Sequence, residues 1–196
     1  MPKIVDHDQR RREILEAAWR VIAEQGIGAA TVREIANEAG CSNGILSHYF
    51  ASKDEILISA HKLAFHRVSE RAAAANNGTN GAGALRQALY EALPLDKERH
   101  IEAVMDVSFW SQALANPRLN AVRRESVAES RLWWLAMLED ARSAGELTAD
   151  VPDGVLCDEI MALIDGVSVQ AVMYPEDMTP ERQRTIADGF LAHLGI

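Results

Sequence analysis

Cysteines and long apolar runs are scarce in this sequence, and their scarcity excludes several classes of protein. Its 196 residues include two cysteines, Cys41 and Cys157, in distant parts of the chain. We therefore expect two reduced thiols in a cytosolic protein rather than a disulfide-stabilised secreted one. No stretch of 18 apolar residues exists, so we expect no membrane span. The charged start, MPKIVDHDQRRRE, lacks the apolar run of a signal peptide.

Catalytic and metal-binding motifs are also missing. The sequence has no G-x-S-x-G, no glycine-rich phosphate loop and no zinc-ligand spacing. His61 and His66 are five residues apart, a spacing that does not place both on one helix face, and we expect both at the surface. Cys157 has no histidine nearby and is interpreted as a small core residue. We expect no enzyme activity, no cofactor and no metal.

An excess of basic residues, which a DNA-binding protein often has, is absent as well. The formal net charge is −9. Residues 1–67 hold nine Lys/Arg and nine Asp/Glu, whereas residues 68–196 hold eleven and twenty. All the excess acid therefore lies outside the first third of the chain. That third is locally neutral and has basic side chains available for an anionic partner, namely Arg10, Arg11, Arg12, Arg33 and Lys53.

Strand signals are almost absent, and apolar residues recur at helical spacing throughout. Asp8 is a candidate cap and Gly26 a candidate stop for a first helix. Further helices are predicted near residues 84–93, 96–115, 118–143, 154–174 and 180–194, with an Asn/Gly-rich loop at 76–83. The fold class is all-α. We predict an N-terminal three-helix domain at residues 1–55 and a helical bundle at residues 56–196.

Residues 31–57, TVREIANEAGCSNGILSHYFASKDEIL, carry the start and stop signals of short helices. Thr31 and Glu34 have the spacing of a capping box, in which each side chain bonds the other residue's backbone N–H. Gly40 lies where a left-handed backbone conformation ends a helix at little cost. Ser42 is placed to cap a second helix. Two helices joined by a glycine turn within about 20 residues are typical of a helix-turn-helix.

The second of these helices is predicted to be anchored from inside by Ile45, Leu46 and Phe50. Its exposed residues near the start are then Asn43, Gly44, Ser47 and His48. Ser52 and Glu55 have the spacing of another capping box, and Lys53 lies where a third helix begins. A lysine beside free backbone N–H groups can bind a phosphate. Two short helices of an all-helical protein that does not bind DNA are the alternative interpretation.

The same stretch resembles the DNA-binding domain of TetR-type bacterial transcriptional regulators. The resemblance covers residues 10–57 and rests on T-V-R-E-I-A-x-E-A-G-x-S followed by H-Y-F-x-S-K-x-E-I-L. The segment I-L-S-H-Y-F is similar to the BetI-type branch, as are D-V-S-F-W-S-Q-A and R-L-W-W-L further along. One departure is Ser47, where most members carry an aromatic residue. Its hydroxyl is then a shorter substitute for that residue's phosphate contact.

The resemblance implies a homodimeric, ligand-responsive regulator, most often a repressor, that binds double-stranded operator DNA. It implies that residues 1–55 are the helix-turn-helix DNA-binding domain and that the helical bundle at 56–196 serves ligand binding and dimerisation. It also implies DNA contacts for nine residues of this chain. These are Thr31, Arg33, Ser42, Asn43, Gly44, Ser47, His48, Tyr49 and Lys53.

Aromatic and acidic residues are interleaved in the acidic part of the chain. Aromatic walls with a carboxylate bind cations well, so we predict a site for an organic cation. The predicted ligand-binding residues are Glu102, Asp106, Phe109, Trp110, Trp133, Trp134 and Asp165. The alternative is that the aromatic rings form the core and the acids a solvated face.

The helix predicted at 154–174 is apolar nearly all round, which is typical of a helix buried on more than one side. One side would face the core and the other a second subunit, completed by the last helix. The predicted interface residues are Ile164, Val172, Phe190 and Leu194. A monomer with a central helix is the alternative. A helical small-molecule-binding protein or enzyme that does not bind DNA is the rival function.

Overall fold

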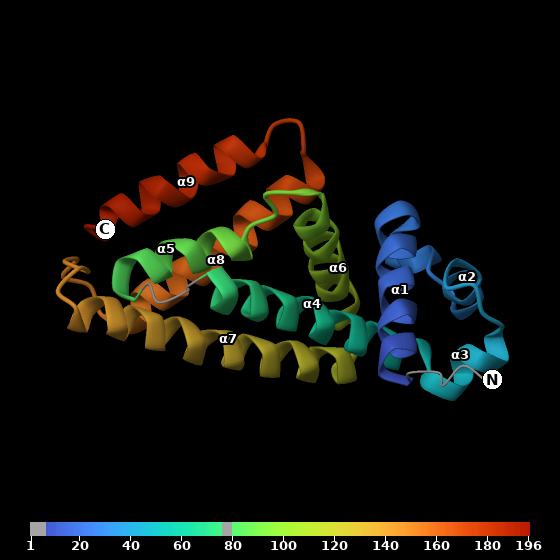
Figure 1. The fold of residues 1–196 in the computed structure, drawn as a ribbon. Coiled ribbons are helices and arrows are strands. Elements are labelled where there is room, and N and C mark those ends of the chain that lie inside the picture. Colours follow the sequence, from blue (N-terminus) through green and yellow to red (C-terminus); the bar gives the residue numbers. More distant parts are fainter. Residues whose placement is uncertain (1–6, 76–79) are drawn as a thin grey trace. The chain divides into compact units, whose positions relative to one another are not determined.

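The computed structural model describes residues 7–75 and 80–196, and every regular element in these ranges is a helix (Figure 1). The helices are α1 His7–Ala29, α2 Val32–Glu38, α3 Asn43–Tyr49, α4 Lys53–Ala75, α5 Gly81–Ala92, α6 Lys97–Ala113, α7 Pro117–Ser143, α8 Asp153–Met173 and α9 Pro180–His193. The predicted all-α fold is confirmed. Within the described ranges, no helix has both the length and the apolarity needed to cross a membrane.

Local signals explain most helix ends. Gly26, the predicted stop of the first helix, has φ 78° and ψ 157° and breaks α1, although helical residues continue to Ala29. The prediction that Asp8 caps this helix is wrong, because α1 already begins at His7 and Asp8 lies in its first turn. The helix predicted near 84–93 begins earlier, at Gly81. Residues 76–79 of the predicted loop lie outside the described residues.

The chain divides into two compact units. Unit 1 comprises Met1–Ala64 and Val104–Val122, and unit 2 comprises Phe65–Ala103 and Arg123–Ile196. The predicted boundary between residues 55 and 56 stays a prediction. The division assigns the second half of α6 to the same unit as α1–α3.

Unit 1 is organised around α1, which packs against α2, while α2 packs against α3 (Figure 1). Ile14, Ile22 and Ile35 are fully buried there, and burial of each such side chain stabilises the fold by about 1.5–3 kcal/mol. Trp19 is also buried and donates its indole N–H to the Ala60 carbonyl oxygen at 3.2 Å. These contacts hold the short α2 and α3, which are too short to be stable alone.

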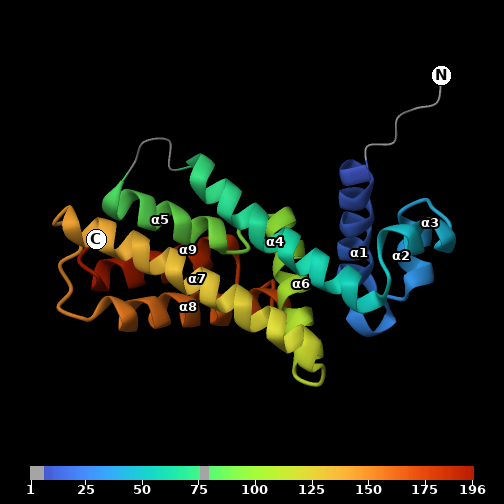
Figure 2. The same cartoon turned by 90° about the horizontal axis from the view of Figure 1, so that it is seen from below.

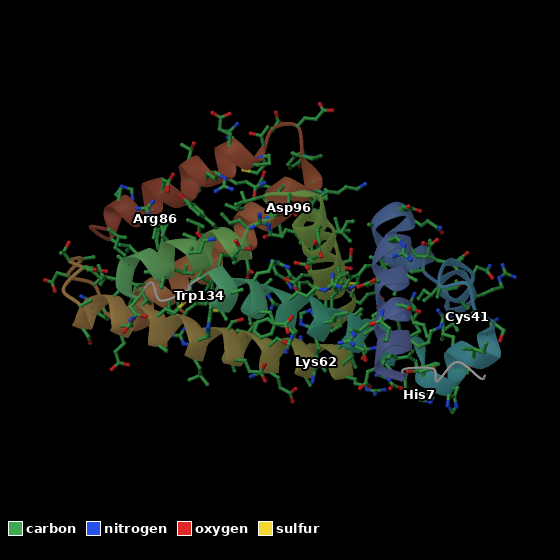
Figure 3. All side chains as sticks on the ribbon, viewed as in Figure 1. His7, Cys41, Lys62, Arg86, Asp96 and Trp134 are labelled. Atoms are coloured by element: carbon green, nitrogen blue, oxygen red, sulfur yellow. The ribbon has the colours of Figure 1, made fainter. Side chains whose placement is uncertain are left out.

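Unit 2 has its own core, in which α5 packs against α8 and α9 (Figure 2). Trp134 of α7, labelled in Figure 3, lies in this core together with Cys157 of α8. Burial raises the pKa of the Cys157 thiol. The interpretation of Cys157 as a small core residue is therefore confirmed, whereas Cys41 is only half-buried.

Candidate nucleic-acid interface and ligand region

The start of α2 is fixed by the capping box predicted from the sequence. The Thr31 hydroxyl accepts the Glu34 backbone N–H at 3.2 Å, and the Glu34 carboxylate accepts the Thr31 backbone N–H at 3.0 Å. The hydrogen bond from the Thr31 hydroxyl, together with that from its backbone, lowers the pKa of Glu34. Both partners therefore hold the helix start in one geometry.

A tight glycine turn joins α2 to α3. Gly40 has φ 62°, and the Cys41 backbone N–H donates to the Ala36 carbonyl oxygen at 2.9 Å. Ser42 then caps α3, since its hydroxyl accepts the Ile45 backbone N–H at 3.2 Å. The turn and both caps confirm the helix-turn-helix predicted from the sequence.

The exposed side of α3 is polar with one exception. Asn43, Gly44, Ser47 and His48 are exposed as predicted, and Tyr49 is half-buried. The prediction that Ile45 anchors the helix from inside is wrong, because its side chain is 48% exposed. Leu46 and Phe50 are buried and define the inward side. Ile45 precedes Leu46 and is therefore turned away from that side by about 100°.

Two arginines of α1 hold the ends of the short helices. Arg10 donates to the Ala39 carbonyl oxygen at 3.1 Å, and Arg11 donates to the Tyr49 carbonyl oxygen at 2.7 Å. The Arg11 guanidinium also lies 4.2 Å from the centre of the Phe50 ring. These cations satisfy carbonyl groups that helix ends leave unpaired. Part of the basic charge expected to face an anionic partner is therefore used inside unit 1.

Lys53 has a similar structural contact. Its ammonium donates to the Ile27 carbonyl oxygen at 2.9 Å, near the end of α1. The hydroxyl of Ser52 accepts the Glu55 backbone N–H at 3.2 Å, but the Glu55 carboxylate accepts from Ala51 instead of Ser52. The second predicted capping box is therefore only half formed. Thr31, which caps α2, and Arg33 of α2 are both exposed.

An aromatic cluster adjoins the exposed side of α3. His7, labelled in Figure 3, lies at the start of α1, with its ring centre 6.2 Å from that of His48 and 5.7 Å from that of Tyr49. The His48 and Tyr49 rings meet edge to face at 5.6 Å. The cluster therefore includes His48, a residue expected to contact DNA.

The prediction that His61 lies at the surface is wrong. Its residue is 2% exposed, its ring stacks on Phe109 at 4.3 Å with 6° between the planes, and its Nδ1 lies 3.1 Å from Asp106. Both partners belong to the part of α6 that lies in unit 1, a packing that no local signal in the sequence reveals. His66 is exposed as predicted. Trp110 is half-buried.

Glu102 of unit 2 is 5% exposed and is bound by Arg71 through two hydrogen bonds of 3.0 and 2.7 Å. Burial alone would lower the pKa of Arg71, but the hydrogen bond and charge of Glu102 raise it by more. Arg71 also approaches Glu91 at 3.4 Å, and Arg99 lies 3.1 Å from Glu91. The sequence gives no hint of Arg71, because 31 residues separate it from Glu102.

The other predicted ligand residues of unit 2 lie on α7 and α8. The Trp133 and Trp134 rings meet edge to face at 4.6 Å, with Trp134 buried and Trp133 half-buried. Asp165 lies 3.7 Å from Arg123 and is half-exposed. The predicted ligand set is thus divided, with Asp106, Phe109 and Trp110 in unit 1 and the other four residues in unit 2. Each of the three predicted carboxylates already faces a basic side chain.

The four residues predicted to form a dimer interface differ in exposure. Ile164 and Val172 of α8 and Phe190 of α9 are half-buried, so each retains surface within a single chain. Leu194 is 2% exposed and packs in the core of its own unit. On α8, Val155 and Met173 are large apolar residues with exposed side chains.

A helix-turn-helix with an exposed polar second helix, joined to a helical body, defines a class of DNA-binding regulators. The family described as "Bacterial regulatory proteins, tetR family" matches residues 14–60, and the family described as "BetI-type transcriptional repressor, C-terminal" matches residues 82–195. The chain belongs to the TetR family of helix-turn-helix transcriptional regulators, with a C-terminal part of the BetI type.

Named relatives agree with this membership. The HTH-type transcriptional regulator PksA of Bacillus subtilis is 30% identical over 187 residues, which cover 95% of this chain and 90% of the relative. The regulator BetI of Cronobacter sakazakii is 28% identical over 194 residues, 97% of this chain and 93% of the relative. A regulator from Saccharomonospora viridis, crystallised in complex with choline, shares the fold with a TM-score of 0.85. It is 24% identical and covers 95% of this chain and 97% of that chain.

Proposed function

We propose that this regulator is a homodimeric repressor that binds a palindrome-like operator through α2 and α3 and leaves it when a small molecule binds. The observation that carries the proposal is the exposed polar side of α3, on which Asn43, Gly44, Ser47 and His48 lie together. Major-groove edges of bases are read by such side chains at the start of a recognition helix. Thr31, Ser42 and Tyr49 are the supporting contacts, and Lys53 is the phosphate contact. Arg33 contacts either a phosphate or a base. The protein would act in the cytoplasm, where bacterial DNA lies.

The acidic charge has a role in this proposal. Residues 68–196 carry the whole formal net charge of −9, whereas residues 1–67 are neutral. A polyanion repels the acidic part and tolerates the neutral part, so that only the surface of α2 and α3 approaches the duplex. The half-exposed residues Ile164, Val172 and Phe190 are proposed to meet a second copy of the chain, with Leu194 supporting them from the core.

The operator proposal is tested with DNA from upstream of the protein's own gene. We expect anisotropy titrations to show sequence-selective binding that weakens as salt rises, because phosphate contacts release counterions. Footprinting should reveal two half-sites about 34–36 Å apart, or a multiple of that spacing. A scrambled duplex of equal length is the control. Binding to one asymmetric half-site by a monomer would contradict the dimer, and equal affinity for the scrambled duplex would contradict sequence-selective operator binding.

For the effector, we propose an organic cation with an apolar portion, such as a quaternary amine. Each unit offers this chemistry by itself: unit 1 has Asp106 with Phe109 and Trp110, and unit 2 has Glu102 and Asp165 with Trp133 and Trp134. The choline complex of the Saccharomonospora viridis regulator is consistent with such a ligand. A cation must displace a basic partner at each carboxylate. Displacement costs least at Asp165, where the pair with Arg123 is long and half-exposed, and most at Glu102.

The energetics require several contacts to act together. Turning a mostly bound population into a mostly released one needs about 5.5 kcal/mol of differential affinity, whereas one cation–π contact supplies about 0.5–2 kcal/mol.

The test is a screen of cations, fatty acyl compounds and neutral aromatics by thermal shift and by release of operator DNA. We expect cations to be selected and Asp165→Asn or Asp106→Asn to weaken the response. Asp158→Asn on α8, which loses an exposed pair with Arg131, is the matched control. Selection of an anionic or neutral compound would refute the proposal of a cationic effector but not the proposal of a DNA-binding regulator.

A further inference from the structure

Ile45 is an exposed apolar side chain on an otherwise polar surface. Among the residues that the structure describes, few large apolar side chains are as exposed, and Ile45 is the one that lies in α1–α3. Its inward neighbours Leu46 and Phe50 account for the packing of α3, so Ile45 is not needed there. Helix propensity does not favour it either, since isoleucine is a weaker helix former than leucine or glutamate.

The position of Ile45 in α3 is well defined. It lies in the first turn, where its backbone N–H is held by the Ser42 hydroxyl at 3.2 Å. One turn later, at the i+3 position, His48 is exposed on the same side of the helix. Gly44 precedes it, and a Cβ at Gly44 would meet only the Ser42 hydroxyl, at 3.8 Å. Ile45, at 48% exposure, therefore presents apolar surface to solvent in the first turn of the helix that reads base edges.

We infer that Ile45 reads thymine, by packing against the C5 methyl group of one thymine in each operator half-site. This inference rests on the proposed DNA-binding function. In the major groove only thymine presents a methyl group, and apolar side chains are its usual partners. A second protein is a poorer occupant, because one apolar side chain among polar ones offers far less than the roughly 800 Å² per partner of a stable protein interface.

The test removes the methyl group from the DNA and not from the protein. The operator is first isolated by selection from randomised duplexes, and each thymine is then replaced by deoxyuridine, symmetrically in both half-sites. Loss of one buried methyl corresponds to about fourfold in affinity, or about 0.8 kcal/mol, and thus to about 15-fold for two half-sites. We expect one symmetric position to show this loss with the unchanged protein. With Ile45→Ala, the same replacement should have no effect.

Two further variants serve as controls. Ile45→Val keeps a branched apolar side chain and should retain most of the uracil penalty. Leu114→Ala removes an apolar side chain that is 88% exposed at the end of α6, and it should leave affinity and base preference unchanged. Circular dichroism verifies that each variant is folded, and the uracil scan of the unchanged protein requires no variant.

The outcomes separate this inference from the function on which it rests. Selective operator binding with no uracil-sensitive position overturns the role of Ile45 alone. A uracil penalty that persists in folded Ile45→Ala overturns it as well. Absence of any selective DNA binding by the unchanged protein overturns both the inference and the proposed function.

Discussion

Removal of the Arg71 side chain is expected to cost unit 2 more stability than removal of any exposed arginine partner. In Arg71→Ala, the buried Glu102 carboxylate loses two hydrogen bonds, of 3.0 and 2.7 Å, and its nearest positive charge. Removing one partner of a buried ion pair costs about 3–5 kcal/mol, because the other charge stays uncompensated. The Arg71 side chain is 28% exposed, so water reaches part of the site and the lower figure applies.

The expected loss is therefore about 3 kcal/mol, which for a chain of this size lowers Tm by about 6–12 °C. Urea unfolding followed by circular dichroism measures it directly. Arg71→Lys keeps the charge but loses the bidentate hydrogen bonding to Glu102. Its stability should therefore lie between those of the wild type and Arg71→Ala. Glu102→Gln leaves Arg71 partly hydrated and should cost less than Arg71→Ala.

Arg86→Ala is the matched control, since Arg86 pairs with Asp188 at 2.7 Å and both side chains are well exposed. Exposed pairs contribute only about 0–1 kcal/mol. In the double variant Arg71→Ala/Glu102→Ala, the losses should be less than additive, with a coupling energy of about 0.5–3 kcal/mol. If Arg71→Ala destabilised the protein no more than Arg86→Ala, the reasoning about buried charge would be refuted.

Two further predictions concern DNA contacts and acid stability. Lys53→Ala should weaken binding to all sequences alike and reduce the salt slope by about one unit. It should also lower Tm, because the hydrogen bond to the Ile27 carbonyl oxygen is removed. His48→Ala should instead change base preference, and the reverse pattern in anisotropy titrations on operator and scrambled duplexes would contradict the assignment. For Asp96, burial raises the pKa, but the Arg99 backbone N–H and guanidinium lower it by more. A lowered pKa stabilises the fold above the unfolded-state value of about 3.9, and this contribution disappears as pH falls through the folded-state value. Asp96→Asn should therefore flatten the acid limb of a pH–stability curve, and an unchanged limb would exclude this contribution.

Local signals predicted the features of α2 and α3 that depend on neighbours in sequence. The Thr31–Glu34 box, the Gly40 turn and the Ser42 cap each involve residues at most a few positions apart, so their spacing is sufficient to infer them. The class of fold followed equally from helical periodicity. Helix boundaries were less exact: Asp8 caps nothing, because α1 begins before it.

Features that depend on distant residues were not predictable in this way. Ile45 and His61 were assigned to the wrong environments. The apolar character of a residue does not determine which side of a short helix faces inward. The sequence around His61 likewise contains no signal for its stacking partner Phe109, which lies 48 residues later. Likewise, Lys53 was expected to be free for phosphate, but its ammonium bonds a carbonyl of α1 that is 26 residues earlier. The ligand residues and dimer residues stay predictions.

Unit 1 is assembled from two separate stretches of chain, and this limits how its helix-turn-helix can be transferred to another protein. A fragment cut after Ala64 would leave behind Phe109, on which the His61 ring stacks, and Asn116, whose amide donates to Asp54 at 2.9 Å. A chimaera that joins residues 1–64 to a foreign sensor would therefore expose a face of α4 that is buried here. A graft that works must also carry residues 104–122, so a biosensor built from this protein needs three junctions in place of one, after residue 64, before residue 104 and after residue 122.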